Sequence, residues 1–404
     1  MNERYSKRTL SHAAELHRTL IAFDAHIDVL LESGTTQQTR ETGRFGISTA
    51  LRSGLSGAAL TVHATGHRRS EAACAAARRE LEARYSTITR MAAAHADRAA
   101  IARSPGEFRS IVAAGRFAIV ISFQNATSIG CDLSALDEWA KRGVRMFAFN
   151  FIGNNQWGDS ARPYPFFGGD QRWGGLSELG KAAVLRLNEL GVIIDVSQSS
   201  GEALADVLAT TSAPVVASHS AVRAIVDTDR NLTDAELHAI KGNGGVVHMA
   251  AFAPYLRNLE PELRVELDQL WIRYGLPKPA RLSDVLSVND HETAQWPEER
   301  FWKFLHEFHE LLDLDHPVAS VRDLVDAIDH AVREIGIDHV GIGSDFNHGG
   351  GVAGWQDVSE TQNVTAELIE RGYPDGDIGK LWGENFLRVW QEVVDRRRAG
   401  ARLP

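Results

Sequence analysis

The stretch Leu20-Ile-Ala-Phe-Asp-Ala-His-Ile-Asp-Val-Leu30 decides the fold, because it is an apolar β-type run that turns polar only near its C-terminal end. Its His26 and Asp28 are two residues apart, so on one strand they point the same way and can bind one metal ion. An isolated pair of this kind is more often two polar residues satisfied by local hydrogen bonds. The interpretation therefore depends on what the other strands carry.

Seven further short runs of apolar and β-branched residues alternate with segments of helical periodicity. Repeated strand–helix alternation is typical of an α/β protein, and eight units indicate a parallel (β/α)8 barrel of the TIM type. The last of the clear helices ends at a glycine, as a C-capped helix does. The eight strands are expected at 20–30, 55–64, 117–125, 144–150, 192–198, 214–220, 244–251 and 339–346, and the clearest helices at 71–99, 176–190, 201–210 and 321–336.

Polar side chains gather at the ends of these strands, where a parallel barrel keeps its catalytic groups. A buried polar group costs free energy unless it is paired, so this concentration favours a metal site. We expect His219, which ends an apolar strand, and Asp345, which follows a glycine-punctuated one, to join the first pair as ligands, with Asp345 also accepting a proton. His63 and His248 lie inside their strands, and a hydrogen bond to a backbone carbonyl would explain either. The polar residues at strand ends are His26, Asp28, His63, Gln124, Asn125, Asn150, Gln198, His219, His248 and Asp345.

Composition excludes several classes of protein. The 404 residues carry 43 basic and 53 acidic side chains and a net charge of -10, which opposes binding to nucleic acid. Cys74 and Cys131 are too few for a disulfide framework or a thiolate metal cluster, and we expect both to be buried free thiols. The charged start lacks the apolar stretch of a secretory signal, and no run reaches membrane-spanning length, so a cytoplasmic protein without a membrane partner is expected.

Two long segments interrupt the strand–helix alternation. Residues 153–175 are rich in glycine and aromatic side chains and follow the fourth strand on the catalytic side. They indicate a lid or a pocket wall, although the aromatics could simply anchor a long loop to the barrel rim. Residues from about 253 to 317 hold helical stretches but still precede the eighth strand. We therefore interpret residues 1–404 as a single barrel domain with an insertion.

Ordered motifs run along the chain from about Phe23 to Trp390. They are Asp24-Ala-His-Ile-Asp, Gly143-Val-Arg, Asn155-Gln-Trp-Gly-Asp, Gly175-Leu-Ser-Glu-Leu-Gly, Ser218-His-Ser, Arg230-Asn-Leu-Thr-Asp, His339-Val-Gly-Ile-Gly-Ser-Asp-Phe and Trp382-Gly-Glu-Asn-Phe-Leu-Arg-Val-Trp. In these motifs the chain resembles the membrane (renal) dipeptidase family of zinc peptidases. The resemblance implies an amidohydrolase-type barrel with two zinc ions, a bridging water that attacks a peptide carbonyl and a dipeptide in a small closed pocket. Such barrels often pair, so a homodimer is left open, although no stretch identifies an interface.

The resemblance assigns roles residue by residue. It makes His26 and Asp28 metal ligands and His219 a ligand of the second metal. Asp345 matches the aspartate that binds metal and moves the proton. Arg230 matches the residue that holds the dipeptide carboxylate, a task suited to a planar guanidinium. From the residues alone, a salt bridge or a contact at a helix start would be the preferred explanation of Arg230, since the Asn-Leu-Thr-Asp that follows it is typical of an N-cap region.

Three positions depart from the family pattern. Gln124 stands where the family has a bridging glutamate, Gln198 where it has a histidine ligand of the second metal, and Asn150 where it has a histidine that polarises the substrate. Two dications about 3.5–4 Å apart repel strongly, and a shared carboxylate offsets this repulsion, whereas a neutral amide cannot. Losing an imidazole weakens the second position again.

We therefore expect one tightly bound metal ion in each chain instead of two. The surviving ligand positions are His26, Asp28, His219 and Asp345. Zinc is expected from the resemblance, while Mn²⁺ and Fe²⁺ also suit a mixed set of nitrogen and oxygen ligands. Three other histidines are available to replace the lost ligands, namely His63, His248 and His348.

Two enzymatic functions on a small-molecule substrate follow. The first is a metal-dependent hydrolase of the dipeptidase type, in which metal-activated water cleaves a dipeptide or similar small amide, with Asp345 as general base. The second keeps the pocket and the metal but catalyses dehydration, cyclisation or another lyase step, which loss of three side chains at the reaction centre would suit. A non-catalytic binding protein is disfavoured, because the ligand motifs are retained.

Overall fold

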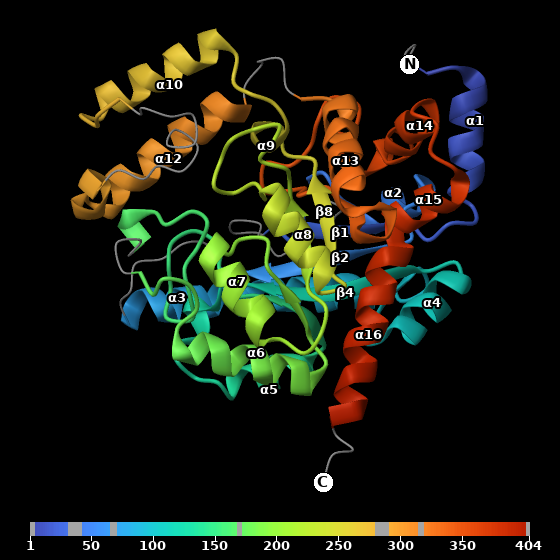
Figure 1. The fold of residues 1–404 in the computed structure, drawn as a ribbon, viewed down its shortest axis with the longest axis horizontal. Coiled ribbons are helices and arrows are strands. Elements are labelled where there is room, and N and C mark those ends of the chain that lie inside the picture. Colours follow the sequence, from blue (N-terminus) through green and yellow to red (C-terminus); the bar gives the residue numbers. More distant parts are fainter. Residues whose placement is uncertain are drawn as a thin grey trace.

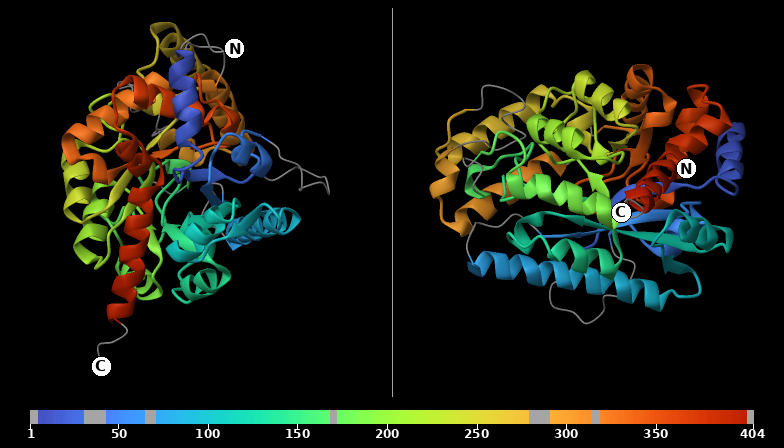
Figure 2. Two further views of the ribbon diagram at one scale, coloured as in Figure 1. Left: turned by 90° about the vertical axis from the view of Figure 1, so that its right-hand side faces the viewer. Right: turned by 60° about the horizontal axis from the view of Figure 1, so that its bottom comes forward.

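A barrel of eight parallel strands forms the centre of the molecule (Figures 1 and 2). The computed structural model describes residues 5–30, 43–64, 71–167, 172–278, 291–313 and 319–400. The strands follow one another in the order β1-β2-β4-β5-β6-β7-β8-β9, and every pair is parallel. The backbone N–H of Asp28 donates to the carbonyl of Phe346, which joins β1 to the residues after β9 and closes the ring. The predicted (β/α)8 barrel is therefore confirmed. The strands span β1 Phe23–Asp28, β2 Gly57–His63, β4 Phe117–Gln124, β5 Val144–Ala148, β6 Ile193–Asp195, β7 Val216–Ser220, β8 Val246–Ala250 and β9 Val340–Gly343.

Helices surround the barrel (Figure 1), and side chains of their flanking residues fix where they begin and end. Thr233 caps α8 in a capping box with Glu236, as the N-cap pattern after Arg230 predicts. The predicted glycine C-cap is found at Gly336, whose φ of 83° is open to glycine and unfavourable for other residues. The helices are α1 Lys7–Leu16, α2 Ile47–Arg52, α3 Glu71–Ala94, α4 Pro105–Ala113, α5 Ala135–Arg142, α6 Glu178–Leu190, α7 Gly201–Thr210, α8 Asp234–Gly242, α9 Ala253–Leu256, α10 Pro261–Arg273, α12 Glu298–Asp313, α13 Val321–Ile335, α14 Gln362–Glu370, α15 Asp375–Gly379 and α16 Asn385–Gly400.

A ninth strand, β3 Ala99–Ile101, pairs with the first residues of β4. The sequence prediction continued a helix to residue 99, because three small apolar residues suit either structure. The prediction for the cysteines was wrong in part. Cys74 and Cys131 are free thiols, but the first is half-buried and the second exposed, because they lie on α3 and in a loop outside the barrel.

The base of the barrel is apolar and its mouth is polar. Alternate residues such as Phe23, Ala59 and Val120 fill the inside of the base, where they pack on Phe386 and Trp390 of α16. Helix α16 and the α10–α12 pair lie at opposite ends of the molecule (Figures 1 and 2). Packed apolar side chains fill the base and leave no partners for polar groups there. The buried polar groups therefore lie at the other end of the strands. Among the described residues, no helix is long and apolar enough to cross a membrane.

The two long segments predicted to interrupt the barrel pack on one another. Phe166, in the segment after β5, stacks on Phe301 of α12 with ring centroids 3.8 Å apart. Phe151 and Ile152 belong to the same aromatic cluster. The insertion therefore supports the chain that leaves β5, next to the barrel mouth. Parts of both segments, residues 168–171, 279–290 and 314–317, lie outside the described residues.

Candidate metal centre

One extra residue in β1 turns His26 and Asp28 into the barrel. The paired positions Asp24↔Ala58 and Ile27↔Leu60 enclose one residue more on β1 than on β2. Before this irregularity Phe23 and Ala25 belong to the inner cluster, and after it Ile27 belongs to the outer one. Strict alternation would have put Ile27 inside. The bulge therefore re-aims the side chains at the strand end.

A second irregularity does the same for β7. Between Ala217↔Val247 and Ser220↔Met249, β7 again carries one residue more than its neighbour. Both Ser218 and His219 consequently reach the barrel interior, where the Ser218 hydroxyl donates to Asp195 Oδ2 at 2.5 Å. The bulge thus presents a histidine together with the hydroxyl that holds it.

His26, His219 and Asp345 form one buried group whose candidate ligand atoms all lie within 4.8 Å of one another. The rings of His26 and His219 stack with centroids 3.7 Å apart, and His26 Nε2 lies 3.9 Å from Asp345 Oδ1. Asp345 has a φ of 57°, in the left-handed region, and its backbone N–H donates to the His26 carbonyl. A strained backbone of this kind persists where the surroundings hold it and is common at functional sites.

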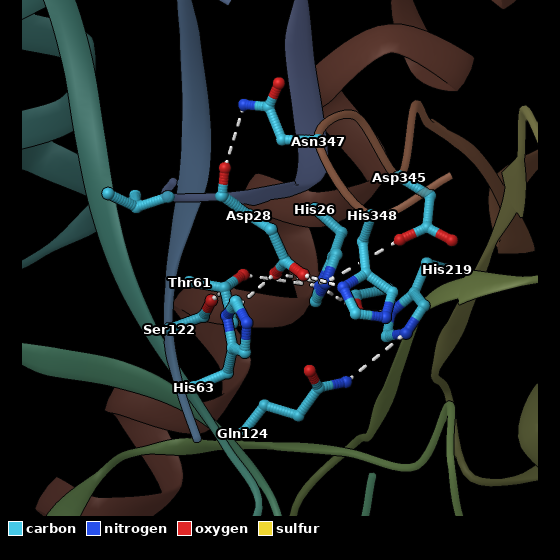
Figure 3. A network of polar contacts seen from close by, with 12 residues as sticks. His26, Asp28, Thr61, His63, Ser122, Gln124, His219, Asp345, Asn347 and His348 are labelled. Carbon is cyan, nitrogen blue, oxygen red and sulfur yellow. Dashed lines mark hydrogen bonds and ion pairs between the residues drawn. The ribbon is translucent and has the colours of Figure 1, made fainter. Parts of the chain in front are cut away.

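His219 is held as a neutral ring whose lone pair is on Nε2. Its Nδ1 lies 2.7 Å from the Ser218 hydroxyl, whose own proton goes to Asp195, so we assign the Nδ1 proton to this contact. Burial, with smaller effects of His26 and Arg230, holds the pKa of His219 well below its usual value. Nε2 then faces the amide nitrogen of Gln198 at 3.0 Å. It also faces the amide nitrogen of Gln124 at 3.4 Å (Figure 3).

Asp28 is the centre of a second group, with His63 and His348 (Figure 3). Its Oδ1 lies 3.3 Å from both His26 Nε2 and His63 Nδ1, and its Oδ2 lies 2.9 Å from His348 Nδ1. Burial alone would raise the pKa of Asp28, but the three facing imidazoles hold it well below its usual range. Burial raises the pKa of Asp345, where the opposing contacts are weaker. The structure therefore divides the four predicted ligands between two groups and adds two histidines.

All members of these two groups except His63 line a cavity of about 250 Å³ at the barrel mouth. Arg162, which the sequence analysis missed, is part of the wall, and its Nη2 lies 3.4 Å from Gln198 Oε1. The signal for Arg162 was only its place in the aromatic segment after β5. The lining residues are His26, Asp28, Gln124, Phe151, Ile152, Arg162, Gln198, His219, Phe252, Tyr255, Asp345, His348 and Gly349.

Several of the residues considered from the sequence are not part of this wall, among them Asn150, Arg230 and His248. The Asn150 amide donates to the carbonyl of Gly158 at 3.0 Å. Arg230 donates to the Ser220 hydroxyl and to the carbonyl of His219, and it lies over the Tyr255 ring. His248 makes the backbone contact that was its alternative explanation, with Nδ1 3.2 Å from the Ala217 carbonyl.

The sequence was compared with models of known protein families. The model of the membrane dipeptidase family, peptidase family M19, matches residues 10–401. The chain belongs to this family. The predicted resemblance is therefore confirmed.

Relatives with solved structures or curated sequences extend the comparison. The probable dipeptidase PvdM from Pseudomonas aeruginosa is 49% identical with a TM-score of 0.92, over 97% of this chain and 100% of that one. Dipeptidase tcpJ of Claviceps purpurea is 28% identical over 331 residues, and dipeptidase ataJ of Aspergillus terreus is 30% identical over 323. These matches cover 81% and 76% of this chain but 63% and 65% of the relatives, so the chain spans slightly less than two thirds of their length.

A more distant solved structure has the same fold. The metallopeptidase from Rhodobacter sphaeroides, solved with a phosphinate mimic of the dipeptide L-Ala-D-Ala, is 21% identical with a TM-score of 0.71. The match covers 93% of this chain and 99% of that one.

Proposed function

We propose that this protein is a metal-dependent hydrolase that cleaves a dipeptide or a similar small amide. The observation that carries the proposal is the buried group His26, His219 and Asp345, which lines a cavity at the barrel mouth in a chain of the membrane dipeptidase family. Two imidazoles and a carboxylate are a donor set that divalent zinc, manganese or iron accepts.

The proposed metal is one tightly bound ion, with zinc as the default. Asp28 completes the group, since its Oδ1 lies 3.3 Å from His26 Nε2. A bound cation would polarise the scissile carbonyl and acidify water. The neutral amides of Gln124 and Gln198 both face the His219 lone pair, where the family pattern implies ligands of a second ion. They cannot offset the charge of a second ion at that position.

The chain's own residues supply the remaining functions. Asp345 is proposed as the general base, because its carboxylate lies beside His26 and lines the cavity. Arg162 lines the same cavity and suits a substrate carboxylate, since a guanidinium binds that group with two parallel hydrogen bonds. Arg230 and Asn150 act from behind the wall, Arg230 by holding the His219 carbonyl and the Tyr255 ring.

Metal analysis and an activity assay on the same sample test this function. Purified protein is measured for metal content per chain and for turnover of a panel of dipeptides that differ in side chain and stereochemistry. We expect turnover that Asp345→Asn reduces by about 10²–10⁴-fold, as loss of a general base does. His248→Gln serves as the control, because His248 bonds a backbone carbonyl outside the cavity. Absence of turnover with one bound metal would favour a lyase-type reaction in the same pocket.

A further inference from the structure

The three residues Asp28, His63 and His348 converge although neighbouring residues do not require it. They come from β1, β2 and the loop after β9, so no local turn brings them together (Figure 3). The side chains of Asp28 and His63 are 2% and 4% exposed, and that of His348 is 31% exposed and lines the cavity. Such burial of a carboxylate and an imidazole costs free energy that must be offset.

The separations fit a shared cation. Two ligand atoms about 2.0 Å from one tetrahedral ion lie about 3.3 Å apart. Asp28 Oδ1 and His63 Nδ1 are 3.3 Å apart, and Asp28 Oδ2 and His348 Nδ1 are 2.9 Å apart. One ligand atom from each of the three residues lies within 4.8 Å of the other two. Two imidazoles and one carboxylate match three-ligand sites that leave a position open.

The contacts within this group are ion pairs whose geometry is poor for hydrogen bonds. Both Asp28 carboxylate oxygens and His63 Nδ1 are buried and lack a hydrogen bond of acceptable direction within the described residues. The Asp28 oxygens and His63 Nδ1 are therefore close together, but no hydrogen atom lies on a line between them that would make a good hydrogen bond. His248 shows the contrast, since it is equally buried and has a backbone carbonyl as partner.

The surrounding chain holds the three residues in place. The Asn347 side-chain amide donates to the Asp28 carbonyl at 2.9 Å. Next to it, the backbone N–H of Asp28 donates a hydrogen bond to the carbonyl of Phe346. Arg84 donates to the carbonyls of Val29 and His63, which joins the ends of β1 and β2. Its charge is partly balanced by Glu80 at 3.3 Å. A site that is organised before the ligand arrives loses less free energy on binding.

We propose that Asp28, His63 and His348 hold a second first-row divalent cation, with Asp28 as the carboxylate shared between the two positions. The family's bridging carboxylate has thus moved from the Gln124 position to β1. The second ion binds more weakly than the first, because only Asp28 and Asp345 balance four positive charges and His348 is partly open to solvent. The inference rests on the proposed first site only through the shared Asp28.

Zinc binding to the full chain tests the second site. Protein stripped with a chelator is titrated with ZnCl₂ while bound zinc is counted, and Co²⁺-loaded crystals locate the ions by anomalous scattering. We expect two ions per chain in two steps. His348→Gln and His63→Gln should weaken only the weaker step, by more than the 10–100-fold typical of losing an outer-shell partner. His219→Gln should weaken only the tighter step, and His248→Gln neither.

Each outcome decides between the alternatives. A single zinc at saturation, or two steps that survive the His63→Gln/His348→Gln double variant, would overturn the proposal. An anomalous peak between Gln124 and Gln198 would do so as well. If a variant fails to fold, the cobalt positions in the unmodified protein decide the question alone. If the zinc titration of the unmodified protein shows the weaker step but not the tighter one, the result would count against the proposed function and leave the second site standing.

Discussion

At the scale of single residues, Gln124 and Gln198 decide how the His219 lone pair is used. Both amide nitrogens face His219 Nε2, at 3.4 and 3.0 Å. In Gln124→Glu/Gln198→His a carboxylate and an imidazole take these places, so we expect the zinc ion that has His219 as a ligand to bind more tightly. Without metal, the buried glutamate should lower the free energy of unfolding by several kcal/mol. Zinc titration and urea unfolding with and without zinc measure both effects. Unchanged zinc binding would contradict the electrostatic explanation of these two glutamines.

Arg162 offers a prediction about substrate binding that assumes the proposed reaction. If its guanidinium holds a substrate carboxylate, Arg162→Lys loses a paired contact worth roughly 1.5–3 kcal/mol, so KM should rise about 10–100-fold. The contact between Arg162 and the substrate carboxylate should be equally strong in the bound substrate and in the transition state, so kcat should change little. Arg257→Lys is the control, since Arg257 pairs with Glu260 on the surface. A fall in kcat at constant KM would assign Arg162 to the reacting atoms instead.

At the scale of elements, the sequence shows the strands but not their bulges. The apolar runs identify all eight barrel strands, because buried parallel strands are rich in apolar and β-branched residues and here turn polar mainly towards their C-terminal ends. The side chains of His26, Asp28 and His219 point into the barrel only because β1 and β7 each carry one extra residue. Register is a property of paired strands, so a single strand cannot reveal it. The same limit hid the approach of His63 and His348 to Asp28, which joins three separate elements.

The turn after β9 gives the prediction at this scale. A Cβ at Gly350 would lie 2.2 Å from the carbonyl oxygens of both Ser344 and Asp345, which are backbone atoms and cannot rotate away. Gly350→Ala should therefore displace the turn that carries Asp345 and His348, lower stability by about 1–3 kcal/mol and weaken zinc binding. Gly106→Ala is the matched control, because nothing lies within 4 Å of the added carbon. Unfolding and zinc titration of both variants check it, and wild-type zinc affinity in Gly350→Ala would show that the turn does not position these ligands.

At the scale of the whole molecule, burying histidines in the barrel makes stability depend on pH. Burial lowers the pKa of His248 from 6.5 to about 4. The unfolded chain then binds more protons than the folded one between these values, so the stability contributed by neutral His248 is complete above pH 6.5 and is lost as the pH falls towards 4. Metal-stripped protein should lose about 2 kcal/mol from this residue between pH 7 and pH 5. Asp24, whose pKa is raised to about 6 by burial, acts in the opposite direction, so the total slope cannot be assigned to one residue.

The comparison with His248→Gln isolates the His248 contribution. The amide keeps a donor for the Ala217 carbonyl and does not titrate, whereas Asp24 and the buried His17 titrate alike in both proteins. Urea unfolding at pH 7 and pH 5 should therefore show a smaller loss of stability in the variant, by about 2 kcal/mol. Parallel pH slopes in the two proteins would mean that His248 takes up a proton without unfolding. The inside of the barrel would then admit charge, and the neutral state assigned to His219, one strand away, would lose its physical basis.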